Sequence, residues 1–328
     1  MTRTGIHDEE VRFDGAHGDR LAGTLILPEG ARGTVVFVHG SGPLDRDQNA
    51  GAQKLNIFNA LAADLAVEGY ATLRYDKRGC GASGGDYQTL GYDDLVADVR
   101  AAVGAARARV PGPVWLCGHS EGTTIAPRAA AGLDGVAGLI LICPFLTPGQ
   151  EILLWQAAQV EREIAAMRGF GGLVARLATR LFGGPVRMQA RLLTKVASTD
   201  APVIRFMGRK QGVRWLRDFL EQDAGAIHRA NSLPTLVIGA AKDAQCPPAD
   251  SPRIAEISGR ASLVMIDDLT HILRRSDQPP GVMHYREELK HPIDPRVAAA
   301  MLDWLAGEGA DQPGSAEASD EGGPSTLH

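Results

Sequence analysis

Residues 114–122 read Val-Trp-Leu-Cys-Gly-His-Ser-Glu-Gly, an apolar run that passes directly into a G-x-S-x-G sequence. The run 114–117 predicts a buried strand, and a helical pattern begins near Ser120. Gly118 and Gly122 permit the strained turn that presents a serine hydroxyl at the carboxyl end of a sheet. This context favours Ser120 as a nucleophile over the alternative in which it only caps a helix.

Strand and helix signals alternate on both sides of this turn. The runs 34–38 and 139–142 are apolar without polar alternation, which is typical of strands buried on both faces of a parallel sheet. Short β-prone runs at 11–13 and 21–27 indicate an antiparallel pair at a sheet edge. A further strand is expected at 71–75, and helices are expected at 56–68, 92–109 and 120–132. The alternation predicts an α/β fold with a mostly parallel, doubly wound sheet.

The alternation stops at Pro144 and resumes at Pro234. Residues 145–232 have helical patterns and no buried-strand signal, so we expect an all-helical insertion between the sixth and seventh strands. After it, strands are expected at 234–238 and 262–266, and helices at 252–257 and 294–306. The sequence therefore predicts one sheet domain in two parts, 1–144 and 233–307. The tail 308–328 is expected to be disordered because it has almost no apolar side chain to bury.

Composition narrows the functional classes. The chain has 328 residues and a formal net charge of −5, which favours neither nucleic acid nor a membrane as partner. Its N-terminus lacks a secretory signal and its apolar runs are too short to span a bilayer, so we expect a soluble cytoplasmic protein. The cysteines have no disulfide or zinc spacing, and neither a metal nor a cofactor is expected; they are Cys80, Cys117, Cys143 and Cys246.

A nucleophilic serine requires a base to take its proton and an acid to orient that base. With this type of turn, the acid and then the histidine follow later in the chain, each on a loop after a strand. Asp243 follows the run 234–238, and His271 follows the run 262–266. The sequence therefore predicts Ser120, Asp243 and His271 as the catalytic residues.

Other residues compete for these roles. Asp250, Asp267 and Asp268 are alternative acids, although Asp250 begins a predicted helix and the Asp267-Asp268 pair is typical of a turn. Cys246 is an alternative nucleophile, but no helix N-terminus follows it to depress its pKa. We interpret His228, His284 and His291 as surface residues, and His39 and His119 as structural ones.

The oxyanion that forms during acyl transfer needs two fixed backbone N–H donors. One is expected from Glu121, directly after the nucleophile, and the other from Ser41 in the loop after strand 34–38. Gly40 and Gly42 flank Ser41 and permit close approach of substrate to the backbone. A competing interpretation makes the Glu121 carboxylate a buried acid.

Several motifs together resemble a known family. His39-Gly-Ser-Gly-Pro43 with Asp45-Arg-Asp47, the stretch Arg74-Tyr-Asp-Lys-Arg-Gly79, and Gly118-His-Ser-Glu-Gly122 are similar to segments of α/β-hydrolase serine esterases, close to bacterial carboxylesterases. The resemblance covers about residues 10–307. It implies the α/β-hydrolase fold and the triad Ser120, Asp243 and His271. Thr270 stands where that family often has Asn or Gly, which leaves the rim of the pocket undefined.

The insertion is expected to cover the nucleophile as a cap and to select the substrate. Its candidate substrate-contacting residues are Trp155, Phe170, Phe206 and Trp215. It has 13 Lys and Arg against 7 Asp and Glu, so its net charge is +6 and that of the rest is −11, which favours an anionic small-molecule substrate. These features predict a serine acyl hydrolase, foremost a carboxylesterase. The alternatives are a thioesterase, a peptidase, a carbon–carbon bond hydrolase and a non-catalytic binding protein.

Overall fold

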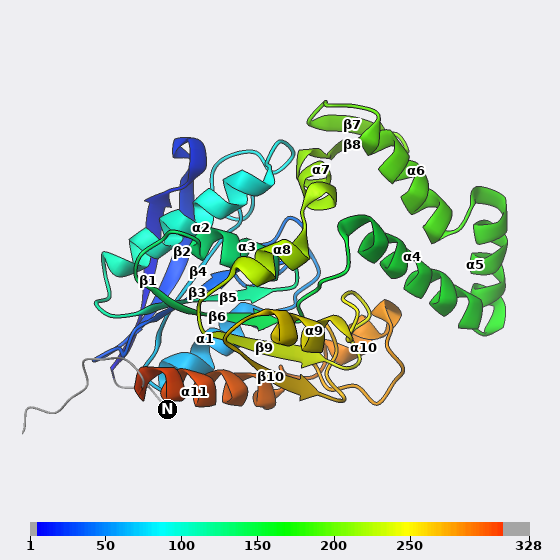
Figure 1. Cartoon of the computed structure of the whole chain (residues 1–328). Helices are drawn as coiled ribbons and strands as arrows, with labels where there is room; N and C mark the ends of the chain where they lie inside the picture. Colours follow the sequence, from blue (N-terminus) through cyan, green and yellow to red (C-terminus); the bar gives the residue numbers. More distant parts are fainter. Residues whose placement is uncertain (1–4, 311–328) are drawn as a thin grey trace, which may run out of the picture.

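The computed structural model describes residues 5–310, and its centre is an eight-stranded sheet with the order β1-β2-β4-β3-β5-β6-β9-β10 (Figure 1). From β4 to β10 all neighbours pair in parallel, whereas β1 pairs with β2 and β2 with β4 in antiparallel fashion. The sheet confirms the predicted α/β fold and its antiparallel edge. Its strands are β1 (Ile6–Asp14), β2 (Arg20–Pro28), β3 (Thr34–Val38), β4 (Ala71–Tyr75), β5 (Val114–His119), β6 (Val136–Ile142), β9 (Thr235–Ala240) and β10 (Ala261–Ile266).

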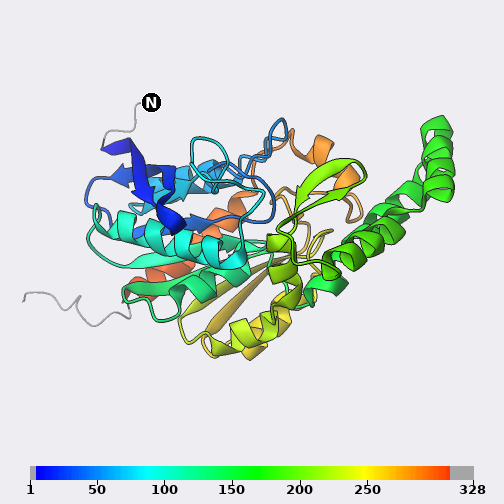
Figure 2. The same ribbon diagram turned by 90° about the horizontal axis from the view of Figure 1, so that it is seen from above.

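Helices cover both faces of this sheet (Figures 1 and 2). One face carries α2 (Tyr92–Arg107), α3 (Gly122–Ala130), α8 (Ala224–Ala230) and α9 (Asp250–Ile257); the other carries α1 (Ile57–Val67) and α11 (Pro295–Ala310). Along β3, Val36 and Val38 join the hydrophobic cluster of the first face, while Val35 and Phe37 join that of the second. The continuous apolar run of β3 is therefore required because both of its faces are buried.

Between β6 and β9 the chain leaves the sheet and forms an insertion. It consists of α4 (Gly149–Ala166), α5 (Gly169–Phe182), α6 (Pro185–Ala197), the hairpin β7 (Val203–Phe206) and β8 (Arg209–Gly212), and α7 (Arg214–Glu221). The prediction of an all-helical insertion is therefore wrong. Met207 and Gly208 both have positive φ, as a two-residue hairpin turn requires, and this short turn between two four-residue strands gives little periodic signal in the sequence.

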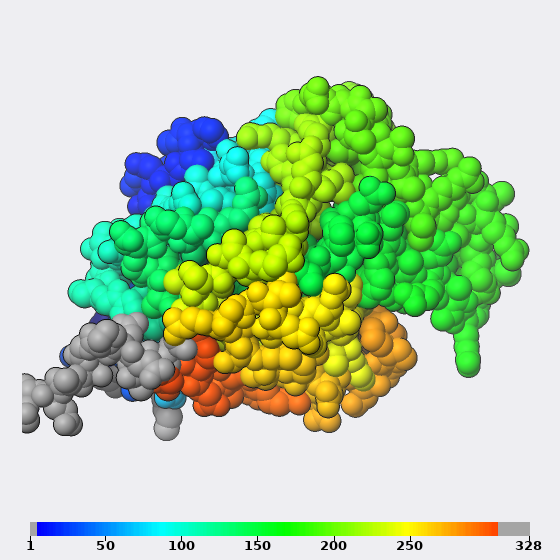
Figure 3. All heavy atoms as spheres, viewed as in Figure 1, coloured from blue at the N-terminus to red at the C-terminus, as the bar shows by residue number. Residues whose placement is uncertain are grey.

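The outer end of the insertion is α5, which extends away from the sheet (Figures 2 and 3). Its residue Gly172 is buried against Met167, at the end of α4, while large apolar side chains such as Phe170 and Phe182 are exposed. None of the described helices combines the length and apolar character of a membrane span.

The C-terminal boundary differs slightly from the expectation. Helix α11 continues to Ala310, past the predicted start of the tail at 308. The rest of the predicted disordered tail, 311–328, lies outside the described residues.

Candidate active site

The turn at Ser120 has the strain that the sequence predicts. Ser120 follows β5 directly and has φ +55°, a left-handed conformation that is costly for a residue with a side chain. A Cβ atom at Gly118 would lie 2.3 Å from the Gly122 carbonyl oxygen, and one at Gly122 would lie 2.2 Å from the Val38 carbonyl oxygen. Only glycine fits at both positions, because the start of α3 crosses so close to the strands.

Asp243 and His271 meet at the carboxyl ends of β9 and β10. The Nδ1 atom of His271 lies 2.7 Å from Oδ2 of Asp243, and both side chains are buried. The other carboxylate oxygen of Asp243 accepts hydrogen bonds from the backbone amides of Gln245 and Cys246, each at 2.7 Å. The carboxylate is thereby fixed on both oxygens, and it selects the tautomer of His271 that leaves Nε2 as a proton acceptor.

Cys246 connects this pair to Ser120. Its sulfur lies 3.9 Å from the Ser120 hydroxyl oxygen, and it gathers with the Asp243 carboxylate and the His271 ring within 4.8 Å. In the described part of the chain, no hydrogen bond joins the Ser120 hydroxyl to the His271 ring. Burial raises the pKa of the Cys246 thiol well above its usual range, so this group stays a protonated thiol and not a nucleophilic thiolate.

His119 contacts the backbone of His271 through a hydrogen bond. Its Nε2 atom lies 2.9 Å from the His271 carbonyl oxygen and therefore donates to it, so Nδ1 accepts from the side-chain amide of Gln48 at 3.1 Å. Burial lowers the pKa of His119 to about 3, and that of His39 likewise to about 3. Both imidazoles are therefore neutral at pH 7. Because its Nε2 carries this proton, His119 is a poor metal ligand in the cluster that it forms with Cys143 and His271.

The loop after β3 lies against the nucleophile. A Cβ atom at Gly40 would lie 3.3 Å from the Cβ of Ser120, so these two residues are in contact. Within the described residues, the amides of Ser41 and Glu121 donate to no other protein atom. Gly42 has φ +102°, a conformation suited to glycine, and it turns the loop immediately after Ser41. The oxyanion-hole assignment of the Ser41 and Glu121 amides stays a prediction, with which their lack of another acceptor among the described residues is compatible.

The competing acids Asp250 and Asp268 have other partners, and one of the competing histidines is buried. Asp250 accepts from Leu146 and Thr147 where the chain enters the insertion, and Asp268 pairs with Arg275 and Arg296. His228, which the sequence places at the surface, is 1% exposed because α8 packs against α3 and α9.

The insertion residues predicted to contact substrate lie in different places. Phe206 lines a pocket of about 670 Å³ between α4, α6 and the Asp243 loop, and Trp155 lines a pocket of about 640 Å³ beside Asp243. Trp215 instead donates a hydrogen bond from its indole to the Glu121 carboxylate. Phe170 is 80% exposed and lines neither pocket.

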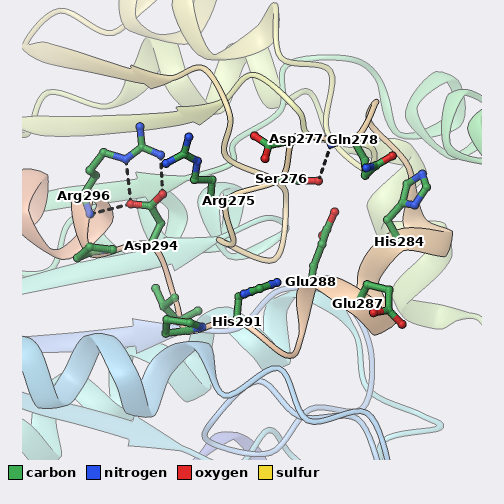
Figure 4. A pocket seen from close by; sticks show the side chains of 13 residues that line it. Arg275, Ser276, Asp277, Gln278, His284, Glu287, Glu288, His291, Asp294 and Arg296 are labelled. Atoms are coloured by element: carbon green, nitrogen blue, oxygen red, sulfur yellow. Dashed lines mark hydrogen bonds and ion pairs between the residues drawn. The ribbon is translucent and has the colours of Figure 1, made fainter.

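A further pocket of about 840 Å³ lies in the segment after His271 (Figure 4). Most of its lining residues are polar types, among them Glu288, His284 and the Arg296–Asp294 ion pair, although the exposed wall is mainly apolar. None of Ser120, Asp243 and His271 lines it, so it is separate from the site described above.

Sequence reasoning assigned no role to Lys77, although this residue belongs to the motif 74–79. Its ammonium group is buried, donates to the Gly40 carbonyl oxygen at 2.6 Å and lies 3.8 Å from the Glu121 carboxylate. The signal that could have identified it is a lysine two residues after a buried strand, where charged side chains are rare unless paired.

Taken with the order of the strands, the serine turn and the Asp243–His271 pair define a protein of the α/β-hydrolase class. The chain belongs to the serine aminopeptidase S33 family, which matches residues 29–276.

Individual relatives are more distant. The chain is 27% identical over 292 residues to Esterase EstD of Thermotoga maritima, covering 87% of this chain but only 65% of that protein. Est1E from Butyrivibrio proteoclasticus, whose structure holds ferulic acid, superposes with a TM-score of 0.56 at 18% identity, covering 90% of this chain and all of Est1E. The α/β hydrolase GrgF from Penicillium superposes with a TM-score of 0.60 at 17% identity, covering 93% of this chain and 99% of GrgF. These likenesses show the shared fold.

Proposed function

We propose that this protein is a serine carboxylesterase. The observation that carries the proposal is the buried Asp243–His271 hydrogen bond, next to Cys246, whose sulfur lies against the strained Ser120. The names of the relatives agree with ester hydrolysis, since EstD is an esterase. In this proposal the insertion acts as a cap over the site.

In the proposed mechanism, each residue of the site has a separate role. The Ser120 hydroxyl attacks the ester carbonyl while His271 Nε2 takes its proton, and Asp243 stabilises the imidazolium that forms. The amides of Ser41 and Glu121 bind the oxyanion of the tetrahedral intermediate. The intermediate collapses, His271 gives its proton to the leaving alcohol, and water then hydrolyses the acyl-enzyme by the same steps. Proton transfer requires the Ser120 hydroxyl to turn from Cys246 toward His271, a movement that substrate binding would favour.

The lining of the pocket that contains Phe206 indicates which class of substrate the site would accept. It contains no charged residue, and its polar groups are the amides of Gln53, Gln156, Gln189 and Gln245 and the Tyr285 hydroxyl. Its wall includes Ala244 and Gln245, which lie between Asp243 and Cys246 in the chain. Such a lining favours an uncharged, largely apolar acyl or alcohol group over the anionic substrate that the charge of the insertion suggests.

The family name makes an aminopeptidase the main competing activity. Recognition of a free α-ammonium group needs an unpaired carboxylate near the nucleophile. Glu163 in the pocket beside Asp243 already accepts from the amides of Val282 and Met283, and Glu121 lies beside Lys77. Glu121 is therefore not available to an ammonium group, and cleavage of an alanine anilide tests whether Glu163 is.

The test compares the wild type with Ser120→Ala and with Ser198→Ala, a control at an exposed serine of the insertion. The substrates are p-nitrophenyl esters from acetate to decanoate, a matched thioester, and an alanine anilide. We expect ester hydrolysis and fluorophosphonate labelling in the wild type and the control, and a loss of at least about 10³-fold in kcat for Ser120→Ala. Preferential cleavage of the anilide, or full activity of Ser120→Ala, would refute the proposal.

A further inference from the structure

A buried ion pair lies behind the two proposed oxyanion donors. The side chains of Lys77 and Glu121 are 2% and 0% exposed, and Lys77 Nζ lies 3.8 Å from Glu121 Oε2. Among the described residues that oxygen has no partner within hydrogen-bond distance, while the other oxygen of the same carboxylate accepts from the Trp215 indole. A fully buried charge pair is costly to desolvate, so its place beside the nucleophile calls for an explanation.

Lys77 acts directly on the first donor. Its ammonium group donates to the Gly40 carbonyl oxygen at 2.6 Å. The peptide from Gly40 to Ser41 is trans, so its N–H points opposite to its C=O, away from Lys77. Holding the carbonyl therefore fixes the direction of the Ser41 amide, and the positive charge polarises the peptide so that this N–H becomes a stronger donor.

Glu121 connects Lys77 to the second donor. The backbone amide of Glu121 is the other proposed donor, and its side chain faces Lys77. Glu121 thus has two roles. Its backbone amide is one proposed oxyanion donor, and its carboxylate balances the charge of Lys77, which orients the Ser41 amide. Burial lowers the pKa of Lys77 and raises that of Glu121, while each charge opposes the shift of the other, so the two depend on each other for ionisation.

Trp215 brings the insertion into this network. It lies on α7, which is anchored on the start of α2 because Asp218 accepts from the Tyr92 amide at 2.8 Å and Arg214 pairs with Asp94 at 3.1 Å. The Trp215 ring also stacks on Phe219, with centroids 5.7 Å apart. Docking of α7 on the sheet domain therefore places the indole donor on Glu121.

We propose that Lys77 is a positioning residue for the oxyanion hole, and that Glu121 and Trp215 couple its position to the docking of the insertion. The inference rests on the proposed ester hydrolysis. According to this inference, stabilisation of the transition state depends on Lys77, whereas binding of the substrate does not.

The experiment uses the full-length chain with Lys77→Met, which removes the charge and keeps most of the side-chain volume. Lys195→Met is the matched control, because Lys195 also donates to a backbone carbonyl but lies exposed in the insertion. Rates with p-nitrophenyl butyrate are normalised to sites labelled to completion by a fluorophosphonate. A trifluoromethyl ketone, which forms a tetrahedral adduct, reports on the oxyanion hole separately.

For Lys77→Met we expect kcat per labelled site to fall about 10²-fold with KM within about twofold, and the inhibition constant of the ketone to rise in proportion. Trp215→Phe, which keeps a ring but removes the N–H, is expected to lower kcat about tenfold in the same pattern. Lys195→Met is expected to match the wild type. A purely structural role would lower the melting temperature and the number of labelled sites while leaving kcat per site and ketone affinity unchanged.

An unchanged kcat per labelled site and an unchanged ketone affinity, in either Lys77→Met or Trp215→Phe, would overturn the inference. If Lys77→Met does not fold, Trp215→Phe decides alone, since its substitution leaves the ion pair in place. If Ser120→Ala keeps full activity, the proposed esterase function is refuted instead. Failure of the proposed function can therefore be distinguished from failure of the inference about Lys77.

Discussion

Acid should destabilise this protein through its buried histidines, and His119 allows the effect to be measured. Burial lowers the pKa of His119 to about 3, against 6.5 for an unperturbed imidazole. Between these values the unfolded chain binds a proton that the folded chain does not. The stability that depends on neutral His119 is therefore complete above pH 6.5 and is lost as the pH falls toward 3.

The expected size follows from linkage. From pH 7.5 to pH 5.0, one such histidine lowers the free energy of unfolding by about 2 kcal/mol, which is 1.5 pH units at about 1.4 kcal/mol each. His39, whose pKa burial also lowers to about 3, contributes a similar amount. His228, whose pKa burial lowers to about 4, adds about 2 kcal/mol, so the three together should cost the wild type about 6 kcal/mol over this range.

The assay is urea unfolding at pH 7.5 and pH 5.0 for the wild type, His119→Asn and the control His7→Asn, which removes an exposed histidine of β1. We expect His119→Asn to be less stable at pH 7.5, yet to lose about 2 kcal/mol less than the wild type on acidification. The control should follow the wild type. Equal losses in His119→Asn and the wild type would refute the reasoning, because they would mean that His119 takes up its proton in the folded state.

Three other substitutions test the catalytic acid Asp243, the turn around Ser120, and the point where the chain enters the insertion. Asp243→Asn removes the acceptor that selects the His271 tautomer, so kcat should fall about 10⁴-fold at nearly constant KM, and a loss below tenfold would contradict the assignment. Gly122→Ala places a Cβ 2.2 Å from the Val38 carbonyl oxygen, so we expect insoluble protein or a thermal transition far below that of the wild type; a wild-type melting curve would contradict this clash. Asp250→Ala leaves the Leu146 and Thr147 amides without their acceptor, which should cost about 2–4 kcal/mol in urea unfolding, and an unchanged midpoint would count against this role.

Much of the fold was predictable because its signals are local. The runs 34–38 and 139–142 lie within β3 and β6, since strands buried on both faces need apolar side chains at every position. The hairpin β7–β8 was missed because its strands are only four residues long and partly exposed, so they have no strong period. The burial of His228 was missed because it depends on the packing of α8 against other helices.

The sequence by itself determined the alternation of strands and helices and the position of the strained serine. Both follow from the side-chain period and from two glycines close to Ser120 in the chain. The sequence also predicted that Asp243 orients His271, and the structure shows their hydrogen bond. Only the tertiary structure decided that Lys77 meets Glu121 and Gly40, and that Trp215 reaches Glu121 from the insertion. Each of these contacts joins residues that are 28 to 94 positions apart. Such distances are closed by the meeting of strand ends at one edge of the sheet and by the docking of the insertion, which no local pattern encodes.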